Sequence, residues 1–167
     1  MAIAKPNPRN LSLAIGLAIA ILAIDQTSKY AVVQHMNLRE IGDIAVAPFV
    51  DFRMAWNTGF NFGLLGSDST TARWILVGFT ALLGLGVLCA SMWVRHALHI
   101  AGLGIAAGGA LGNMIDRVYY GAVADFLNVS CCGIENPWSF NVADIAIFAG
   151  FGLLFWPTSR ATGDVAA

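Results

Sequence analysis

The sequence predicts an α-helical integral membrane protein with four transmembrane helices and a small β subdomain outside the membrane. Of its 167 residues, 57% are hydrophobic and only 11% are charged, whereas soluble domains carry about 25% charged residues. Four apolar runs approach the roughly 20 residues that a spanning helix needs. The longest segment between these runs is rich in Val and Phe and alternates partly, which is typical of short strands. We therefore expect one membrane domain over residues 1–167.

The first predicted span covers about residues 11–33. Its apolar run is only about two-thirds of a span, so we expect the helix to continue through Asp25 and Lys29 with these polar groups facing the bundle. The alternative is a cleavable signal peptide, because basic residues precede the run and Ala18-Ile-Ala20 resembles a cleavage site. The apolar residues that follow Ala20 favour the membrane helix.

The second and third predicted spans, about residues 72–94 and 97–116, follow each other so closely that they form a hairpin. The fourth, about residues 139–157, reaches membrane length only if residues 139–144 join its helix, which draws Asp144 to the membrane edge. The third span carries glycines at four-residue spacing: Gly104, Gly108 and Gly112. Small residues at this spacing let two helices approach closely in lipid.

The predicted β subdomain covers about residues 37–70. Its centre suggests one or two short strands with Pro48 at an edge or bend, followed by a turn at Asn57-Thr-Gly59. Four spans place both termini on one side, and the basic residues before the first span favour a cytoplasmic amino terminus. The subdomain then lies over the outer face, where a small sheet could position an extended peptide.

Acidic residues are distributed unevenly across the predicted membrane. Of ten Asp and Glu residues, only Asp164 falls on the side of the termini. Asp25, Asp116 and Asp144 fall at the outer ends of the first, third and fourth spans. A proton or ion pathway would scatter such groups through the midplane, so this pattern indicates chemistry at one face of the bilayer.

Asp125 and Asp144 are the candidate catalytic residues. No Lys or Arg lies between Arg117 and Arg160, so neither acid has a basic neighbour in its own segment. Ionisable groups at a membrane boundary are costly and therefore functional candidates, and two unpaired carboxylates can share a proton as an acid/base pair. Asn141, three residues before Asp144, could orient that carboxylate. Spacing alone leaves open the alternative that both acids simply face water.

The other polar residues favour structural roles. Asp25 and Lys29 are four residues apart, in the favourable order for a helical ion pair. Asp116 has a cation beside it in Arg117, and both share a helical stripe with Asn113. We therefore expect Asp116 to stay ionised and to act as a scaffold with Arg117 as its partner.

Several classes of site are not supported by the sequence. A net charge of −1 argues against nucleic acid binding. The histidines form no His-Glu-x-x-His motif and the cysteines show no metal-ligand spacing, so no metal site is predicted. No Gly-x-Ser-x-Gly motif is present. We expect the adjacent Cys131 and Cys132 to be free thiols, with a disulfide between them as the alternative.

Five short blocks occur in order along residues 25–144. They are Asp25-x-x-Ser28-Lys29, Asn57-x-Gly59-x-x-Phe62, Gly112-Asn113-x-x-Asp116-Arg117, Val123-x-Asp125-Phe126 and Phe140-Asn141-x-Ala143-Asp144. Each block alone is weak, but all five on four spans resemble the bacterial lipoprotein signal peptidases, also called signal peptidase II. One departure is Phe60-Asn61, where the family usually has two small residues. This departure affects the expected shape of the pocket wall.

The resemblance implies a four-span aspartyl endopeptidase of the bacterial inner membrane with a small periplasmic β-cradle. Family members remove the signal peptide from prolipoproteins before the diacylglyceryl-modified cysteine. By match to the last two blocks, Asp125 and Asp144 are the catalytic pair, which uses a water at the outer interface and no metal or other cofactor. Other matching positions are expected to hold the substrate backbone or the pair: Asn57, Gly59, Asn113, Arg117 and Asn141.

The resemblance also implies location and partners. Both termini are expected in the cytoplasm, with the active site facing the periplasm. The expected partners are diacylglyceryl-modified prolipoprotein signal peptides and membrane lipids, and inhibition by peptide antibiotics is expected from the family.

Two other classes of protein compete with this interpretation. An ion- or proton-coupled transporter would use Asp25, Asp116 and Asp144 as relay groups, but the chain lacks the paired repeats and broken midplane helices of transporter sites. A non-enzymatic assembly protein would use the glycine stripe of the third span as a dimer face.

Overall fold

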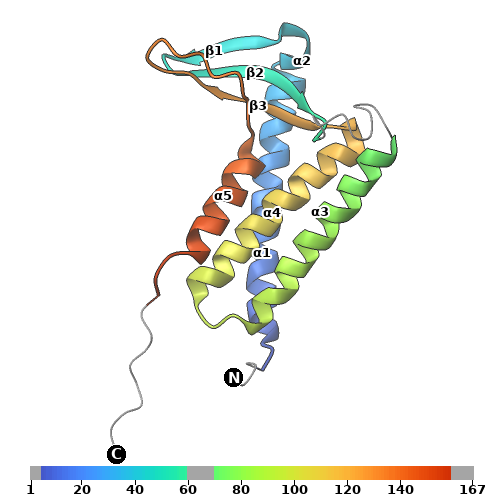
Figure 1. Ribbon diagram of the computed structural model, residues 1–167, viewed down its shortest axis with the longest axis vertical. Helices are drawn as coiled ribbons and strands as arrows, with labels where there is room; N and C mark the ends of the chain where they lie inside the picture. The colour runs from blue at the N-terminus through green and yellow to red at the C-terminus, as the bar shows by residue number, and fades with distance from the viewer. Residues whose placement is uncertain (1–4, 60–69, 159–167) are drawn as a thin grey trace, which may run out of the picture.

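The computed structural model describes residues 5–59 and 70–158. Helices α1, α3, α4 and α5 stand side by side beneath a three-stranded sheet, and the described chain begins and ends at the far end of these helices (Figure 1). In chain order the elements are α1 (Pro8–Lys29), its π-helical continuation η1 (Tyr30–His35), α2 (Leu38–Ile41), β1 (Asp43–Ala47), β2 (Val50–Asn57), α3 (Thr70–Ala90), the short 3₁₀-helix η2 (Ser91–Trp93), α4 (Ala97–Tyr120), β3 (Val123–Val129) and α5 (Val142–Leu154).

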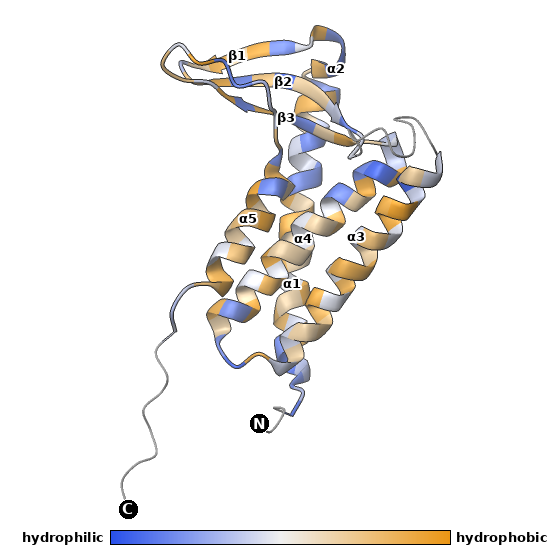
Figure 2. Cartoon of the chain, in the orientation of Figure 1, coloured by the Kyte–Doolittle hydropathy of each residue, from blue (hydrophilic) through white to orange (hydrophobic). Residues whose placement is uncertain are grey.

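Among the described residues, three helices are long and apolar enough to cross a membrane: Pro8–His35, Thr70–Trp93 and Ala97–Tyr120. Their outward surfaces are mostly hydrophobic (Figure 2). Helix α5 is apolar but has only 13 residues, or about 20 Å at 1.5 Å per residue. The predicted extension from residue 139 is wrong, because Phe140 pairs with Leu127 of β3 and Asn141 caps the helix.

The first helix continues through its polar segment, as predicted. Pro8 starts it, and the side chain of Asn7 accepts the backbone N–H of Arg9 as a cap. Asp25 and Lys29 lie inside the helix and are buried. Because η1 then extends the helix to His35, its last turns rise above the other helices and support the sheet.

Helix α4 is the central helix and packs against α1, α3 and α5. The glycine stripe is used inside the chain: a Cβ on Gly104 would lie 2.6 Å from the carbonyl oxygen of Ala14, and one on Gly108 would lie 2.6 Å from that of Ala18. These contacts allow no side chain, so the backbones of α1 and α4 touch. The stripe therefore binds α1 and is not a dimer face, which removes the main support for an assembly protein.

The sheet has the order β1-β2-β3 and is antiparallel throughout. The first two strands lie in the predicted segment, but β3 was not predicted, because its seven residues carry little alternation. Phe126 of β3 packs edge-on against Phe52 of β2, with ring centroids 5.7 Å apart, and joins Val33 and Leu38 in one buried cluster. The lower face of the sheet is thereby fixed on η1 and α2.

The loop after β3 corrects one prediction. Sγ of Cys131 is bonded to Sγ of Cys132, so the two thiols expected to be free form a disulfide. The chain turns sharply here, since Cys132 has φ 63° and Gly133 has φ 80°. This turn lies at the tip of the loop that returns to Phe140.

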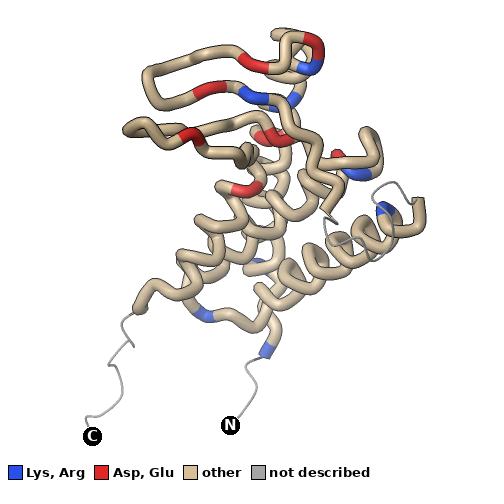
Figure 3. Tube along the Cα trace, turned by 45° about the horizontal axis from the view of Figure 1, so that its top comes forward, with Lys and Arg blue, Asp and Glu red and all other residues tan. Residues whose placement is uncertain are grey.

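Acidic residues of the described chain gather toward the sheet end of the molecule (Figure 3). The start of α1, which contains Arg9, and the connection between η2 and α4, which contains Arg95, lie at the opposite end (Figure 1). The separation agrees with the unequal distribution predicted from the sequence.

Candidate active site

Lys29 is the centre of a buried charge cluster formed with Asp25 and Asp116. Its Nζ lies 2.8 Å from Oδ2 of Asp25 and 2.7 Å from Oδ2 of Asp116, and these side chains are at most 2% exposed. The predicted pair of Asp25 with Lys29 is confirmed. The partner predicted for Asp116 is wrong: it is Lys29 of α1 and not the adjacent Arg117, because consecutive helical residues point about 100° apart.

Gln26 completes the charge cluster and was not predicted from the sequence. Its Nε2 donates to Oδ1 of Asp116 at 3.0 Å and to Oδ2 of Asp25 at 3.1 Å. The only indication in the sequence was that Gln26 directly follows Asp25, and adjacent helical residues rarely share a hydrogen-bond partner. In the structure Gln26 donates both to Asp25 and to Asp116, which comes from helix α4.

The charge cluster also holds the backbone beside both candidate catalytic acids. Oδ2 of Asp116 accepts the N–H of Ala124 at 3.1 Å, and Oδ1 of Asp25 accepts the N–H of Ala143 at 2.9 Å. Ala124 directly precedes Asp125, and Ala143 directly precedes Asp144. The cluster therefore fixes β3 and the start of α5 relative to each other.

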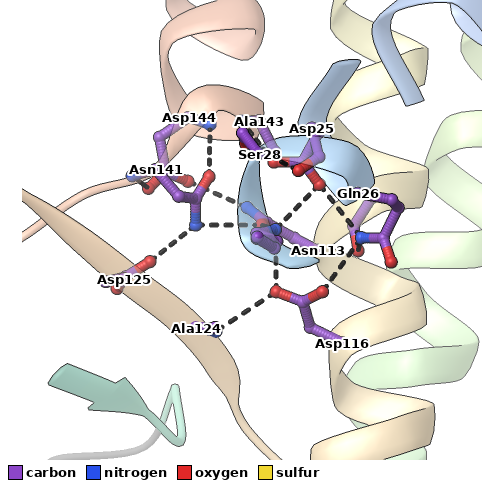
Figure 4. Close-up of polar contacts among 12 residues, drawn as sticks. Asp25, Gln26, Ser28, Asn113, Asp116, Ala124, Asp125, Asn141, Ala143 and Asp144 are labelled. Atoms are coloured by element: carbon purple, nitrogen blue, oxygen red, sulfur yellow. Dashed lines mark hydrogen bonds and ion pairs between the residues drawn. The ribbon is translucent and has the colours of Figure 1, made fainter. Parts of the chain in front are cut away.

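Asp125 and Asp144, the candidate dyad, come from different elements and are joined by two asparagine side chains (Figure 4). Nδ2 of Asn141 donates to Oδ1 of Asp125 at 2.6 Å, and Nδ2 of Asn113 donates to Oδ1 of Asp144 at 2.8 Å. Nδ2 of Asn141 also lies 3.2 Å from Oδ1 of Asn113. Lys29 donates to that same oxygen at 3.2 Å, so the network connects the dyad to the charge cluster.

Asn141 has a second role as the cap of α5. Its Oδ1 accepts the N–H of Asp144 at 2.9 Å, while Oδ2 of Asp144 accepts the N–H of Asn141 at 3.1 Å. This reciprocal capping box is why the helix begins at Val142 and why Asp144 lies in its first turn. The Asn-x-x-Asp spacing predicted to orient the carboxylate does so through this cap.

The environment of Asp125 favours its protonated form. The side chain is buried, and burial followed by the neighbouring charge of Asp144 raises the pKa of Asp125 from 3.8 to about 6. Hydrogen bonds from Asn57 and Asn141, and the charge of Lys29, act in the opposite direction. Among the described residues, no Lys or Arg forms an ion pair with either member of the dyad.

Asn57, Gly59 and Arg117 lie at the side of the dyad. Oδ1 of Asn57 accepts the N–H of Gly59 at 2.9 Å, and Gly59 has φ 80°, which favours glycine. A Cβ there would lie 2.9 Å from Leu76 and 3.3 Å from Nη2 of Arg117. Arg117 donates through Nη1 to the carbonyl oxygen of Asn113 at 3.3 Å, while its buried Nε has no partner among the described residues. Phe60-Asn61 lies outside the described residues.

Each acid of the dyad faces a cavity. Asp125 lines a cavity of about 250 Å³ under the sheet, which is also lined by Ala55, Trp56, Asn57, Thr58, Pro137, Trp138 and Ser139. Asp144 lines a more apolar one of about 610 Å³ with Phe140, Ile145, Phe148 and Ala149. A third cavity, about 160 Å³, lies among α3, α4 and α5 and is lined by Asn113 and Arg117 among mostly apolar residues.

A family model described as signal peptidase (SPase) II matches residues 17–160. The chain belongs to the signal peptidase II family. It is 41% identical over 138 residues to a lipoprotein signal peptidase of Methylorubrum extorquens, covering 79% of this chain and 77% of that protein. It is 39% identical over 166 residues to one of a Methylobacterium species, covering 95% and 96%.

The fold is also similar to that of solved bacterial membrane enzymes. A bacterial membrane enzyme determined by the in meso method at 2.3 Å resolution superimposes with a TM-score of 0.70 and 25% identity, covering 92% of this chain and 90% of that one. As a signal peptidase II, the protein is a peptidase, and its apolar helices make it an integral membrane protein.

Proposed function

We propose that this signal peptidase II is an aspartyl endopeptidase that removes the signal peptide of prolipoproteins before a diacylglyceryl-modified cysteine. The observation that supports the proposal best is the candidate dyad: two carboxylates from β3 and α5 held by neutral amides and lining cavities. The relatives named above are lipoprotein signal peptidases. Four spans, with α5 as the shortest, remain our proposal for the membrane domain.

The proposed mechanism assigns one proton to the dyad. Two close carboxylates do not both ionise readily, and the raised pKa of Asp125 makes it the member that holds the proton. Asp144 takes a proton from a water whose oxygen attacks the scissile carbonyl carbon, while Asp125 gives its proton to the carbonyl oxygen. On collapse, Asp144 protonates the leaving amine of the cysteine and Asp125 recovers its proton from the hydroxyl. No metal or other cofactor takes part in these steps.

The surrounding residues have assigned roles in the same proposal. Asn57 and Asn141 hold Asp125 in position, and Asn113 holds Asp144. Arg117 has an unused Nε–H next to the apolar cavity and would donate to a substrate carbonyl. Gly59 keeps the wall beside Arg117 free of a side chain.

The proposed orientation places the sheet and the dyad on the periplasmic side of the inner membrane, with both termini in the cytoplasm. Arg9 and Arg95 at the opposite end support it, because basic residues favour the cytoplasm. A reporter active only in the cytoplasm should function when fused after Arg160 and fail when inserted near Ser67. The reverse pattern would move the dyad to the wrong face.

The activity is tested with two synthetic precursor peptides that differ only in the diacylglyceryl group on the cysteine. The purified protein in lipid nanodiscs should cleave the modified peptide on the amino side of that cysteine and leave the unmodified one intact, as measured by mass spectrometry. Chelators should not change the rate. Failure to cleave the modified peptide, together with proton flux in proteoliposomes, would favour the transporter.

A further inference from the structure

A second polar cavity lies between the upper end of α1, η1 and the end of α4, and neither member of the dyad lines it. Its volume is about 370 Å³, within the range of about 300–1,000 Å³ that small-molecule sites occupy. We call it the tyrosine cavity. The lining residues that matter here are Gln26, Lys29, Tyr30, Gln34, Tyr119 and Tyr120.

The tyrosine cavity offers two amide oxygens that are free to accept hydrogen bonds. Gln26 uses its Nε2 on Asp25 and Asp116, and Gln34 uses its Nε2 on the hydroxyl of Tyr120 at 3.1 Å. Within the described part of the chain, no donor reaches the Oε1 atom of either glutamine. Lys29 offers no spare N–H, because its ammonium already serves two carboxylates and Asn113.

Charge and aromatic rings favour a cation in the same place. The charge cluster beneath the cavity contains two carboxylates and one ammonium, a formal net charge of −1. Tyr30 and Tyr119 are 67% and 76% exposed, and the ring of Tyr119 meets that of Tyr120 edge-on at 4.7 Å. Ring faces attract cations, so the rings and the formal charge of the cluster favour the same kind of group.

We propose that the tyrosine cavity binds the primary ammonium headgroup of a phosphatidylethanolamine lipid. An ammonium carries three N–H donors, which match the free amide oxygens, and a positive charge, which matches the rings and the net charge. The depth of the cavity in the membrane also suits a lipid headgroup, because the cavity lies where α1 and α4 end at the sheet. Tyrosines are enriched at such membrane–water interfaces. The site is separate from the proposed peptidase chemistry and does not depend on it.

Native mass spectrometry with an equimolar lipid mixture tests this site. The lipids share their acyl chains and carry ethanolamine, N-methylethanolamine, N,N-dimethylethanolamine, choline or glycerol headgroups. We expect retention to fall stepwise as N–H donors are lost, with phosphatidylethanolamine retained about fivefold over phosphatidylcholine, because choline has no N–H to donate. Equal retention of ethanolamine and choline lipids, or preference for the glycerol headgroup, would overturn the proposal.

Two variants locate the preference in the protein. Gln34→Leu, alone or with Tyr119→Leu, should lower the ethanolamine-to-choline ratio toward one, because it removes one of the free amide oxygens that would accept from the ammonium. Trp74→Leu is the matched control, because Trp74 is also exposed, at 52%, but lies on α3 away from the cavity. If the control loses the preference equally, the site is elsewhere. Should the double variant fail to fold, the single change of the exposed Gln34 and the wild-type headgroup series still decide.

Discussion

The charge cluster and the candidate dyad each contain two aspartates, but they differ in what holds them. Asp25 and Asp116 share one buried ammonium, that of Lys29, at 2.8 and 2.7 Å. Asp125 and Asp144 receive side-chain hydrogen bonds from neutral asparagine amides. Asp125 is buried and held by neutral amides, and burial with the charge of Asp144 raises its pKa to about 6, so this carboxyl can exist in both protonation states.

This difference suggests a structural role for the charge cluster and a catalytic role for the candidate dyad. The charge cluster holds the backbone N–H of Ala124 and of Ala143, the residues just before the two members of the dyad. The cluster therefore positions both dyad residues through the backbone next to them, without contacting their side chains. We expect changes in the cluster to affect mainly stability, and changes in the dyad to affect mainly turnover.

The largest expected effect is on turnover by the dyad. Asp125→Asn and Asp144→Asn keep the volume and an oxygen acceptor but cannot exchange the shared proton. Cleavage of the diacylglyceryl-modified peptide should fall by about 10³- to 10⁴-fold in each. The double variant should be scarcely slower, because residues that act as a unit are not additive. Substantial turnover by a folded single variant would exclude the two-aspartate mechanism.

The next effect is on stability through the charge cluster. Asp116→Asn or Asp25→Asn replaces one of the two carboxylate partners of Lys29 with a neutral amide, which should cost about 1.5–3 kcal/mol of unfolding free energy. The control is Asp43→Asn, which breaks the exposed ion pair with Arg53 and should hardly change the thermal midpoint in detergent. An Asp116→Asn protein as stable as wild type but without turnover would contradict the structural role of the cluster.

The dyad should show a stability change of opposite sign. Because the folded-state pKa of Asp125 is raised to about 6, stability is lost as the pH rises from the unfolded pKa of about 3.9 to that value, and the full cost is present above it. Asp125→Asn should therefore stabilise the protein by about 1–2 kcal/mol at pH 8 and not at pH 3.5. Thermal melts at both pH values measure this difference. Destabilisation at pH 8 would show that the carboxylate form is the stabilised one.

The smallest expected effect separates the two roles of Asn141. Asn141→Ser keeps a capping oxygen but removes the amide that lowers the pKa of Asp125. The pKa should rise, and the alkaline limb of kcat/KM should move up from about 6 by roughly one unit. Asn141→Ala should show the same shift and also lose about 1 kcal/mol of stability with the cap. If the alkaline limb of kcat/KM is unchanged in both variants, Asn141 does not influence the pKa of Asp125.

Much of the molecule follows from patterns within a few residues of sequence. The apolar runs predict helices of membrane length, because transfer into lipid depends on composition over about 20 residues. The glycine stripe predicts close helix packing, although the partner, α1, was not predicted. The ion pair of Asp25 with Lys29 follows from helical periodicity. The start of α5 and the partner of Asp116 were predicted wrongly, because each depends on a contact from another element.

The sequence by itself determined which residues are polar in an apolar chain and on which helices or loops they fall. Only the tertiary structure decided which of them meet. Asn113 reaches Asp144 across 31 residues, and Asp25 reaches the backbone of Ala143 across 118. Helical periodicity and hydropathy relate residues a few positions apart. Contacts across such separations depend instead on how α1, α4 and α5 pack and on where β3 pairs, and these in turn follow from backbone contact at glycines and from strand hydrogen bonds.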